Sequence, residues 1–442
     1  MPLSPPLCLL SCALLALSAA TAVAQELPSG RYRTPRAGEG FETDLFGSPV
    51  IVPRRDRRRT LALTLGAAYF DPVLGDINAT PLFNLYWLRF WRDRRIYGLF
   101  SAAFNRVEFA EQFAPLGHTR REGLLEAIAI AENYTIPTPL VEATEDGREA
   151  HGSEVWWGRI SLDGGLGLRR PIAPFAVDND LRLQALAHAE WDYFHVVDSG
   201  DDKNQTTPGA IIPPDTLIYG GRFVFRFDAI ERNLLELPHN GVAAGVALDA
   251  LRRDKWVEAG LRGPTGARTA PARDTRDIIR LTGYLYVAFG SPMLTDKHRF
   301  VAQAHAGWAP PGSVDRFSAF RLGAGPLQSE ANDLARASYP GANFDQLTAD
   351  RYFIGSFTYR YEVLFFLFVH ARVVAAWGRV GEWDPAAWRQ RFEKRSGLAY
   401  CGGVTTGFAF KSQILFEYSY DDGFARDGRD GHGFLFMWSK SF

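Results

Sequence analysis

The sequence predicts an all-β fold, a 16-stranded antiparallel transmembrane β-barrel. Three observations support this prediction: long segments in which apolar residues recur at every second position, connections that alternate between short and long, and an aromatic content of 13%, with 32 Phe and 11 Trp. Soluble strands average ~5–6 residues, whereas strands that cross a membrane need ~9–11. The alternating segments run for about 10–15 residues, which is the length that a membrane requires.

The alternation separates an apolar face from a polar face in each segment. In LIYGGRFVFRFD (217–228), Phe223 and Phe225 lie on one face, and Arg222 and Arg226 lie on the other. Successive side chains of a strand point to opposite sides of its sheet. A sandwich core does not accept unpaired charges, and lipid requires every backbone N–H and C=O to be paired, which a closed barrel achieves. We therefore expect the apolar faces to contact lipid and the polar faces to enclose a lumen.

Sixteen segments fit this pattern, and the fifth, near 138–145, fits it least well. Outer-membrane barrels have short turns at one end and long loops at the other. Here the short connections are 92–95, 135–137, 291–297, 363–365 and 409–410, and the long ones are 108–121, 198–214, 252–276, 309–350 and 378–395. The predicted strands lie near 60–70, 83–92, 95–107, 122–134, 138–145, 153–169, 179–197, 215–228, 240–251, 277–289, 298–308, 351–362, 366–377, 396–408, 411–421 and 432–442.

The chain divides into a leader, a short polar segment and the barrel. Residues 1–24 combine an apolar run with an A-x-A motif, which is typical of a secretory signal peptide. Without them the only cysteine is Cys401, so no intrachain disulfide is expected. Residues 25–58 are polar and rich in arginine, and we expect a loose segment or a small plug. Residues 59–442 form the predicted outer-membrane barrel domain, in which the long connection 309–350 is a candidate to fold into the lumen.

The final residues, GFLFMWSKSF, predict the strand that closes the barrel. A terminal aromatic residue on such a strand resembles the sorting signal that the barrel-assembly machinery reads in outer-membrane proteins. We therefore expect a location in the bacterial outer membrane, with outer-membrane lipids and the barrel-assembly machinery as partners. The side chains expected to face lipid on this strand are Phe434, Phe436, Trp438 and Phe442.

Two stretches carry a pattern of motifs. In 225–248 a strand ends in Asp, an Arg/Asn turn follows, and P-x-x-G opens the next strand. In 320–325, FRLGAG enters a long loop, and the strand that follows this loop contains Tyr-Arg. The matching residues are Asp228, Arg232, Asn233, Pro238 and Gly241 in the first stretch, and Leu322, Gly323, Tyr359 and Arg360 in the second.

These motifs resemble the barrel domain of the bacterial surface antigen superfamily, the relatives of BamA and TamA, over the C-terminal half of the chain. The family loop carries an R-G-F/Y triplet whose Arg pairs with an Asp on a facing strand. This loop lacks the triplet, and the facing strand has His370 and Arg372 instead of Asp. Because both members of the pair are missing, neither is left as a buried unpaired charge. The resemblance therefore implies a barrel-only member, without substrate-capturing POTRA domains, that is not a BamA-type insertase.

Charged residues on the predicted inward faces are candidates for the lumen. They either line a selective pore, because lumen charges tune selectivity, or form an ion-pair network that stiffens a filled barrel. In the long loop, Arg321 and Arg336 either constrict the pore and latch the loop or remain solvated, and Gly323 supplies backbone freedom for the entry bend. The candidate lumen residues are Arg182, His188, Glu190, Asp192, Arg222 and Arg226.

The sequence gives little support for catalysis. No HExxH or H-x-H motif is present, so neither a metal site nor a cofactor is predicted. A lipid hydrolase would need a nucleophile, a His and a polar partner at one rim. His151, Ser153 and Glu154 are the nearest approach, and chance composition in a loop is the simpler interpretation. A formal net charge of −1 provides no basic field for nucleic acid.

The leading functional hypothesis is transport or membrane biogenesis: passage of a small solute, or handling of lipid or protein at the barrel seam. The alternative is a plugged structural or surface-exposed barrel without transport. A third, weaker hypothesis is an outer-membrane lipid hydrolase, although we predict a protein that is not an enzyme. The substrate and the oligomeric state do not follow from the sequence.

Overall fold

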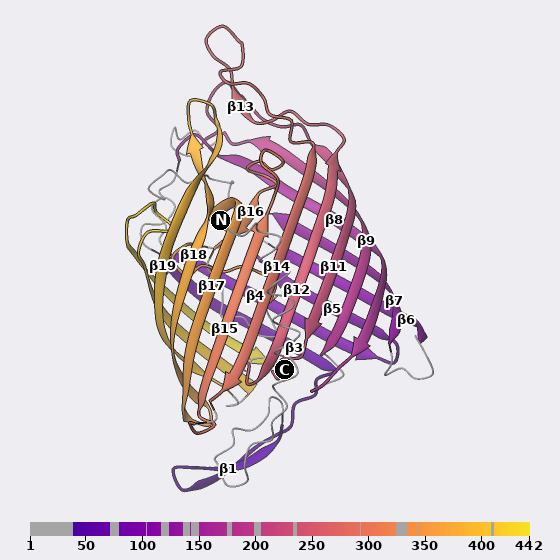
Figure 1. Cartoon of the computed structure of the whole chain (residues 1–442), viewed down its shortest axis with the longest axis vertical. Coiled ribbons are helices and arrows are strands. Elements are labelled where there is room, and N and C mark those ends of the chain that lie inside the picture. Colours follow the sequence, from indigo (N-terminus) through magenta and orange to yellow (C-terminus); the bar gives the residue numbers. More distant parts are fainter. Residues whose placement is uncertain are drawn as a thin grey trace, which may run out of the picture.

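The computed structural model shows a closed antiparallel barrel in which each strand pairs with its neighbours in the chain (Figure 1). The structure describes residues 39–442 except 71–78, 103, 116–122, 136–141, 143–149, 175–178, 199–204, 233–236, 292, 324–333, 344 and 408–410. The predicted leader lies outside the described residues. The spanning strands are β3 (Arg59–Phe70), β4 (Ala79–Trp91), β5 (Arg94–Ser101), β6 (Phe104–Pro115), β7 (Leu124–Thr135), β8 (Val155–Pro171), β9 (Asp180–Val196), β11 (Thr216–Asp228), β12 (Gly241–Arg253), β14 (Asp277–Gly290), β15 (His298–Trp308), β17 (Leu347–Leu364), β18 (Leu367–Asp384), β19 (Arg389–Thr406), β20 (Ser412–Asp421) and β21 (Gly431–Ser441).

These are 16 spanning strands, so the predicted fold class is confirmed. The barrel closes where β21 pairs with β3 through nine residue pairs, from Gly433↔Phe70 to Ser441↔Ala62. The hydroxyl groups of Thr64 and Ser439 lie 2.7 Å apart across this seam, on the lumen side. The first and last strands are therefore joined by a continuous ladder over the whole length of β21 that faces β3.

The two faces of the closing strand differ as the alternation predicts. Phe436 is 48% exposed on the outside, whereas its neighbour Leu435 is 6% exposed inside. Phe434 and Phe442 are also exposed, and Trp438 is half-buried. An outward band of large apolar side chains around a closed barrel is the surface that lipid requires. Within the described residues, no helix is long and apolar enough to span a membrane.

One predicted loop is a strand. Residues 108–121 were expected to form a loop, but β6 runs to Pro115. Its alternation is hidden because Glu111, which faces outward, is charged and pairs with Arg94 of β5 at 2.8 Å. The predicted strand near 138–145 falls almost entirely outside the described residues, and Glu142, which is described, is not in a strand.

Two predicted connections also differ in length. The chain between β7 and β8 runs from 136 to 154, so 135–137 is not a short turn. The predicted long loop 378–395 is instead mostly paired, because β18 continues to Asp384 and β19 begins at Arg389. These extended strand ends carry charges on both faces, as expected for a hairpin that projects beyond lipid into water (Figure 1).

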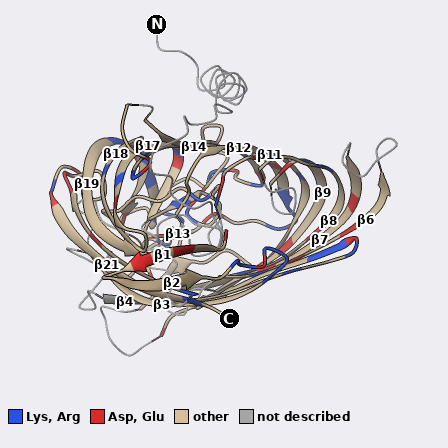
Figure 2. Ribbon diagram, turned by 90° about the horizontal axis from the view of Figure 1, so that it is seen from below, with Lys and Arg blue, Asp and Glu red and all other residues tan. Residues whose placement is uncertain are grey.

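Most of the long connections lie at one end of the barrel, called here the outer end, and the turns 92–93, 291–297 and 365–366 lie at the other, the inner end (Figure 1). The small sheet of β10 (Ala210–Ile211) and β13 (Gly260–Leu261) lies among the outer connections. The described part of the polar segment 25–58 forms a hairpin of β1 (Phe41–Leu45) and β2 (Ser48–Val52) at the inner end (Figure 2). The Phe41 ring lies 5.8 Å from that of Phe365, in the β17–β18 turn.

Candidate functional site

The lumen is filled in its outer part by the connection between β15 and β17. Its described residues, 309–323 and 334–346 with the exception of 344, are called the plug, and they include β16 (Phe320–Leu322), which pairs with β17. Leu322 and Tyr339 of the plug are buried in one apolar cluster with wall residues such as Ile278 and Val374. The predicted connection 309–350 thus divides into the plug and residues 347–350, which begin β17 in the wall.

Polar contacts hold residues 339–341 of the plug to β20 and to the β20–β21 connection, and these contacts are called the latch. Tyr339 donates a hydrogen bond to the Asp421 carboxylate at the end of β20. Arg426 donates to the same carboxylate at 3.1 Å and to the carbonyl of Gly341 at 3.0 Å. Ser419 donates to the carbonyl of Pro340 at 3.1 Å. Burial, and then the negative Asp421, raise the pKa of Tyr339 far above its usual value, so the phenol remains a donor at neutral pH.

A second contact holds the plug to β4, which lies across the β21–β3 closure from β20. The side-chain amide of Asn343 donates to the hydroxyl of Thr80, on β4, at 2.7 Å. Nearby, the Tyr134 hydroxyl of β7 donates to Asp345 at 3.0 Å. The plug is therefore anchored to β4 and β7 as well as to β20.

Aromatic side chains from the outer connections and strand ends close the outer end around one buried arginine. Arg316 of the plug pairs with Glu142 at 2.9 Å and donates to the carbonyl of Ser153 at 2.8 Å. Burial lowers the pKa of Arg316, and Glu142 offsets part of that effect. We call this cluster the aromatic roof; its members are Tyr134, Trp157, Phe194, Trp256, Phe317, Trp383 and Trp388.

A buried ion pair supports the roof from β12. Arg253 and Asp315 lie 2.7 Å apart, and the Arg253 guanidinium lies 3.5 Å from the centre of the Trp256 ring. Burial opposes ionisation of Asp315, but the charge of Arg253 and hydrogen bonds from Arg253, Thr275 and the Phe317 backbone together outweigh it, so the pKa of this carboxyl lies below its usual value. The pair therefore remains charged at neutral pH.

The six predicted lumen residues all face inward, and most are paired. His188 contacts Asp163 at 2.7 Å, and Arg222 lies 2.8 Å from Asp249 and 3.1 Å from Asp163. The others are Arg182, 2.5 Å from Asp180; Arg226, 2.7 Å from Asp228; Glu190, 3.8 Å from Arg159; and Asp192, which is buried. This arrangement has the form of an interior ion-pair network.

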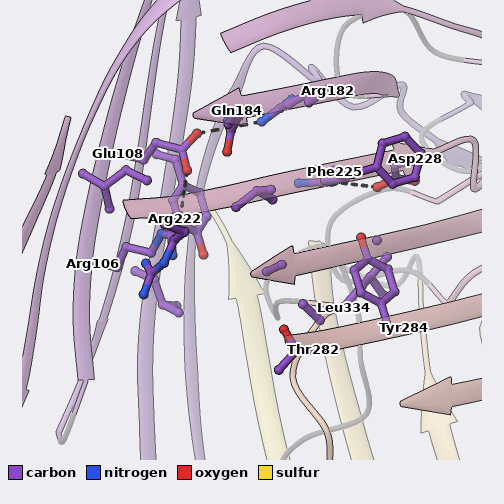
Figure 3. A pocket seen from close by; sticks show the side chains of 18 of the residues that line it. Arg106, Glu108, Arg182, Gln184, Arg222, Phe225, Asp228, Thr282, Tyr284 and Leu334 are labelled. Carbon is purple, nitrogen blue, oxygen red and sulfur yellow. Dashed lines mark hydrogen bonds and ion pairs between the residues drawn. The ribbon is translucent and has the colours of Figure 1, made fainter. Parts of the chain in front are cut away.

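A cavity of about 410 Å³ lies in the lumen below the plug. Leu334 and Ala335 of the plug form part of its lining. Figure 3 shows Arg106, Glu108 and Arg222 close together at one side of this cavity. Its wall comes from β4, β5, β6, β7, β9, β11, β12 and β14.

The predicted loop residues hold the plug together. Arg321 donates to the carbonyl of Arg316 at 2.6 Å and lies over the Trp157 ring at 5.6 Å. Arg336 lies 3.5 Å from Asp345 within the plug. A Cβ at Gly323 would lie 2.0 Å from the carbonyl oxygen of Asn343, so close backbone approach is what demands glycine here.

The two motif stretches meet at the inner end. Arg360 of β17 donates to the carbonyl of Pro238 at 2.8 Å, and Tyr359 contacts His298 at 2.8 Å. Gly241 has a φ of 114°, and a Cβ there would lie 2.1 Å from the carbonyl oxygen of Ala229. Asp228 accepts hydrogen bonds from Arg226 and Arg232. Asn233 lies outside the described residues.

The candidate hydrolase residues occupy a structural position. Ser153 is fully buried, and its hydroxyl accepts the backbone N–H of Glu142 at 2.9 Å. His151 is exposed. The latch residues Tyr339 and Asp421, and Arg316 with Glu142, did not emerge from the sequence, because their partners lie far apart in the chain and no local spacing marks them.

Comparison with known proteins concerns the fold. No family model matches the chain, and no curated protein matches it. Among solved structures it is similar to CdiB from Acinetobacter baumannii (11% identity, TM-score 0.47, covering 92% of this chain and 66% of that one). It is also similar to BamA from Haemophilus ducreyi lacking POTRA domains 1–3 (10%, 0.47, 91% and 75%). CymD, a monoaromatic hydrocarbon channel, is a further neighbour (7%, 0.35, 88% and 89%).

The chain spans just under two thirds of the length of the CdiB chain. Similarity at 7–11% identity concerns the barrel fold alone.

Proposed function

We propose that this chain is an outer-membrane barrel of the bacterial surface antigen superfamily that passes a small solute through its lumen, with the plug as its gate. The observation that carries the proposal is the position of the plug above a cavity. The described plug residues occupy the outer part of the lumen, and the inner part encloses a space of about 410 Å³ directly beneath them.

The contacts between the plug and the wall suit a reversible gate. The latch and the Asn343–Thr80 contact are hydrogen bonds of side chains with separate partners on β20 and β4. Each such bond contributes about 0.5–1.5 kcal/mol net, because water replaces it when the plug moves. If only the segment around 339–343 moves, while β16 stays paired with β17, an open state a few kcal/mol above the closed state is populated enough for a substrate to select it.

The alternative of lipid or protein handling at the seam has less support. The nine-pair ladder between β21 and β3 leaves no gap in the described backbone at the closure. A plugged structural barrel remains the competing hypothesis, because the same contacts would serve a permanent seal.

A reversible cross-link separates the gate from the permanent seal. The variant Thr80→Cys/Asn343→Cys joins the plug to β4 where the native side chains already touch. Proteoliposomes that contain this variant are tested for swelling in isotonic solutions of small solutes, first oxidised and then reduced. Each single-cysteine variant is the control, since buried Cys401 is present in all of them.

We expect swelling in the reduced state and much slower swelling in the oxidised state. Equal swelling in both states would show that the plug is not the gate. No swelling in either state, with wild-type protein equally inactive, would favour the structural barrel.

A further inference from the structure

We propose that the cavity below the plug binds a small amphipathic anion: an aromatic or hydrocarbon body with one carboxylate. This inference rests on the proposed transport function, since it names the class of solute that the lumen would pass. It is carried by two walls of opposite character, one apolar and one cationic, that line the same cavity.

The first wall is made of apolar side chains that point into the lumen, where polar side chains are expected. Tyr86 and Leu88 of β4, Tyr97 and Leu99 of β5 and Phe104 of β6 line the cavity. The ring centres of Tyr86 and Tyr97 lie 5.4 Å apart, edge to face. The lumen of a water-filled barrel is lined by polar residues, so an inward apolar wall needs an apolar occupant to remove it from water.

The second wall is cationic at its surface. The cavity is lined by six arginines and only three carboxylates. In some of these pairs the arginine is the more exposed partner: the Arg226 side chain is 35% exposed, whereas its partner Asp228 is 1% exposed. Arg106 is likewise 25% exposed beside the less exposed Glu108, at 11%. Arg95 is the reverse case, at 4% against 11% for Glu108. At Arg226 and Arg106, a ligand in the cavity therefore meets a guanidinium group before it meets an acid.

The ion pairs use only some of the N–H donors of these guanidinium groups. Each guanidinium carries five N–H donors, and a carboxylate pair uses only some of them. Arg226 donates through Nη2 to Asp228, which uses one of its five donors, although its Nε is buried and does not face the cavity. Arg222 donates through Nε and Nη1 to two different acids. An incoming carboxylate can accept from the remaining donors without displacing the protein's own acids.

The dimensions agree with a small ligand. Pockets for small molecules usually measure ~300–1,000 Å³ and combine apolar lining with a few polar groups. A space of about 410 Å³ lies in the lower part of that range. The apolar wall would hold the body of the ligand, and the arginines of β6 and β11 would hold its carboxylate.

The test compares three probes that share one body and differ in charge: 2-naphthoate, 2-naphthylmethanol and 2-naphthylmethylammonium. Full-length protein is placed in phosphatidylcholine nanodiscs, and binding is measured by equilibrium dialysis against empty nanodiscs. We expect 2-naphthoate to bind about tenfold or more tightly than the ammonium probe, with the alcohol between them. This comparison uses wild-type protein and does not depend on any variant.

Variants then test which wall binds the carboxylate of the probe and which wall binds its apolar body. Arg226→Gln leaves Asp228 paired with Arg232, and we expect it to weaken 2-naphthoate about tenfold while leaving the alcohol unchanged. Leu99→Gln should weaken the acid and the alcohol alike. Arg94→Gln, on the outward face of β5 and paired with Glu111, is the matched control and should bind 2-naphthoate as wild type does. Heat-modifiable migration on gels checks that each variant is folded.

Equal binding of all three probes, binding of none, or an Arg226→Gln variant indistinguishable from Arg94→Gln would overturn the inference. Binding at equilibrium does not require the plug to move. Loss of charge selectivity with intact redox-controlled swelling therefore refutes the ligand class alone, and selective binding without any swelling refutes the transport function alone.

Discussion

Tyr339 of the plug donates its phenolic hydrogen to Asp421, at the outer end of the penultimate strand β20. The two residues are 82 positions apart in the chain. Asp421 also accepts from Arg426, which binds the plug backbone at Gly341. One carboxylate thus connects the plug to the wall. Whether the Tyr339–Asp421 hydrogen bond is formed should therefore determine how often the plug moves out of the lumen.

Removal of the Tyr339 hydroxyl should loosen the plug. The variant Tyr339→Phe keeps the ring that packs against Phe424 but loses the donor to Asp421. Loss of one partner of a buried hydrogen bond costs about 1–3 kcal/mol, so openings in planar bilayers should become roughly tenfold more frequent. Tyr400→Phe, on the outward face of β19, is the control and should open as rarely as wild type. Equal opening frequencies in the two variants would exclude the latch.

Alkaline pH should weaken the same contact. The pKa of Tyr339 is raised by burial and by Asp421 above the usual value of about 10. The folded protein therefore holds this proton more tightly than the unfolded chain, and the stabilisation is complete below pH ~10 and declines as the pH rises further. Between pH 9 and pH 11, the midpoint of thermal unfolding should fall further for wild type than for Tyr339→Phe. Parallel declines would show that the phenol does not contribute.

Truncation of Arg316 should destabilise the outer end. The variant Arg316→Met leaves Glu142 buried without its partner, which costs about 3–5 kcal/mol. Adding Glu142→Gln removes the stranded charge and should restore part of the loss. Arg391→Met breaks a pair in which the arginine is 62% exposed, and should cost under about 1 kcal/mol. Urea unfolding followed by tryptophan fluorescence measures all three; similar costs for Arg316 and Arg391 would contradict the aromatic roof as a structural unit.

A cross-link at the seam should leave solute passage intact. The hydroxyls of Thr64 and Ser439 are 2.7 Å apart, so Thr64→Cys/Ser439→Cys should form a disulfide across the closure. If the solute passes through the lumen, swelling rates with the disulfide formed and reduced should agree. A rate that falls only in the oxidised state would indicate that the route runs through an opening between β3 and β21.

The barrel was predictable because its signal is local. The alternation of β21 places Phe434 and Phe436 outside and Leu435 inside from sequence alone, since strand side chains alternate whatever their partners are. The same rule failed for β6, where an outward Glu111 paired with Arg94 breaks the apolar stripe. It also missed the paired ends of β18 and β19, because strands in water need no apolar face.

The candidate site was only partly predictable. The inward charges on β9 and β11 follow from the alternation, and their partners on neighbouring strands follow from antiparallel pairing. The latch and the aromatic roof depend on how the plug enters the lumen, which brings together Arg316 and Glu142, 174 positions apart. The two walls of one cavity likewise emerge only once β4, β5 and β11 are curved into a barrel.

Planar-bilayer conductance tests the central claim most directly. A variant in which 309–346 is replaced by a short Gly-Ser turn, folded by the criterion of heat-modifiable migration, is compared with wild type. If the plug blocks the lumen, wild type should carry no steady current and the shortened variant should carry one. A steady current through wild type, or none through the shortened barrel, would contradict it.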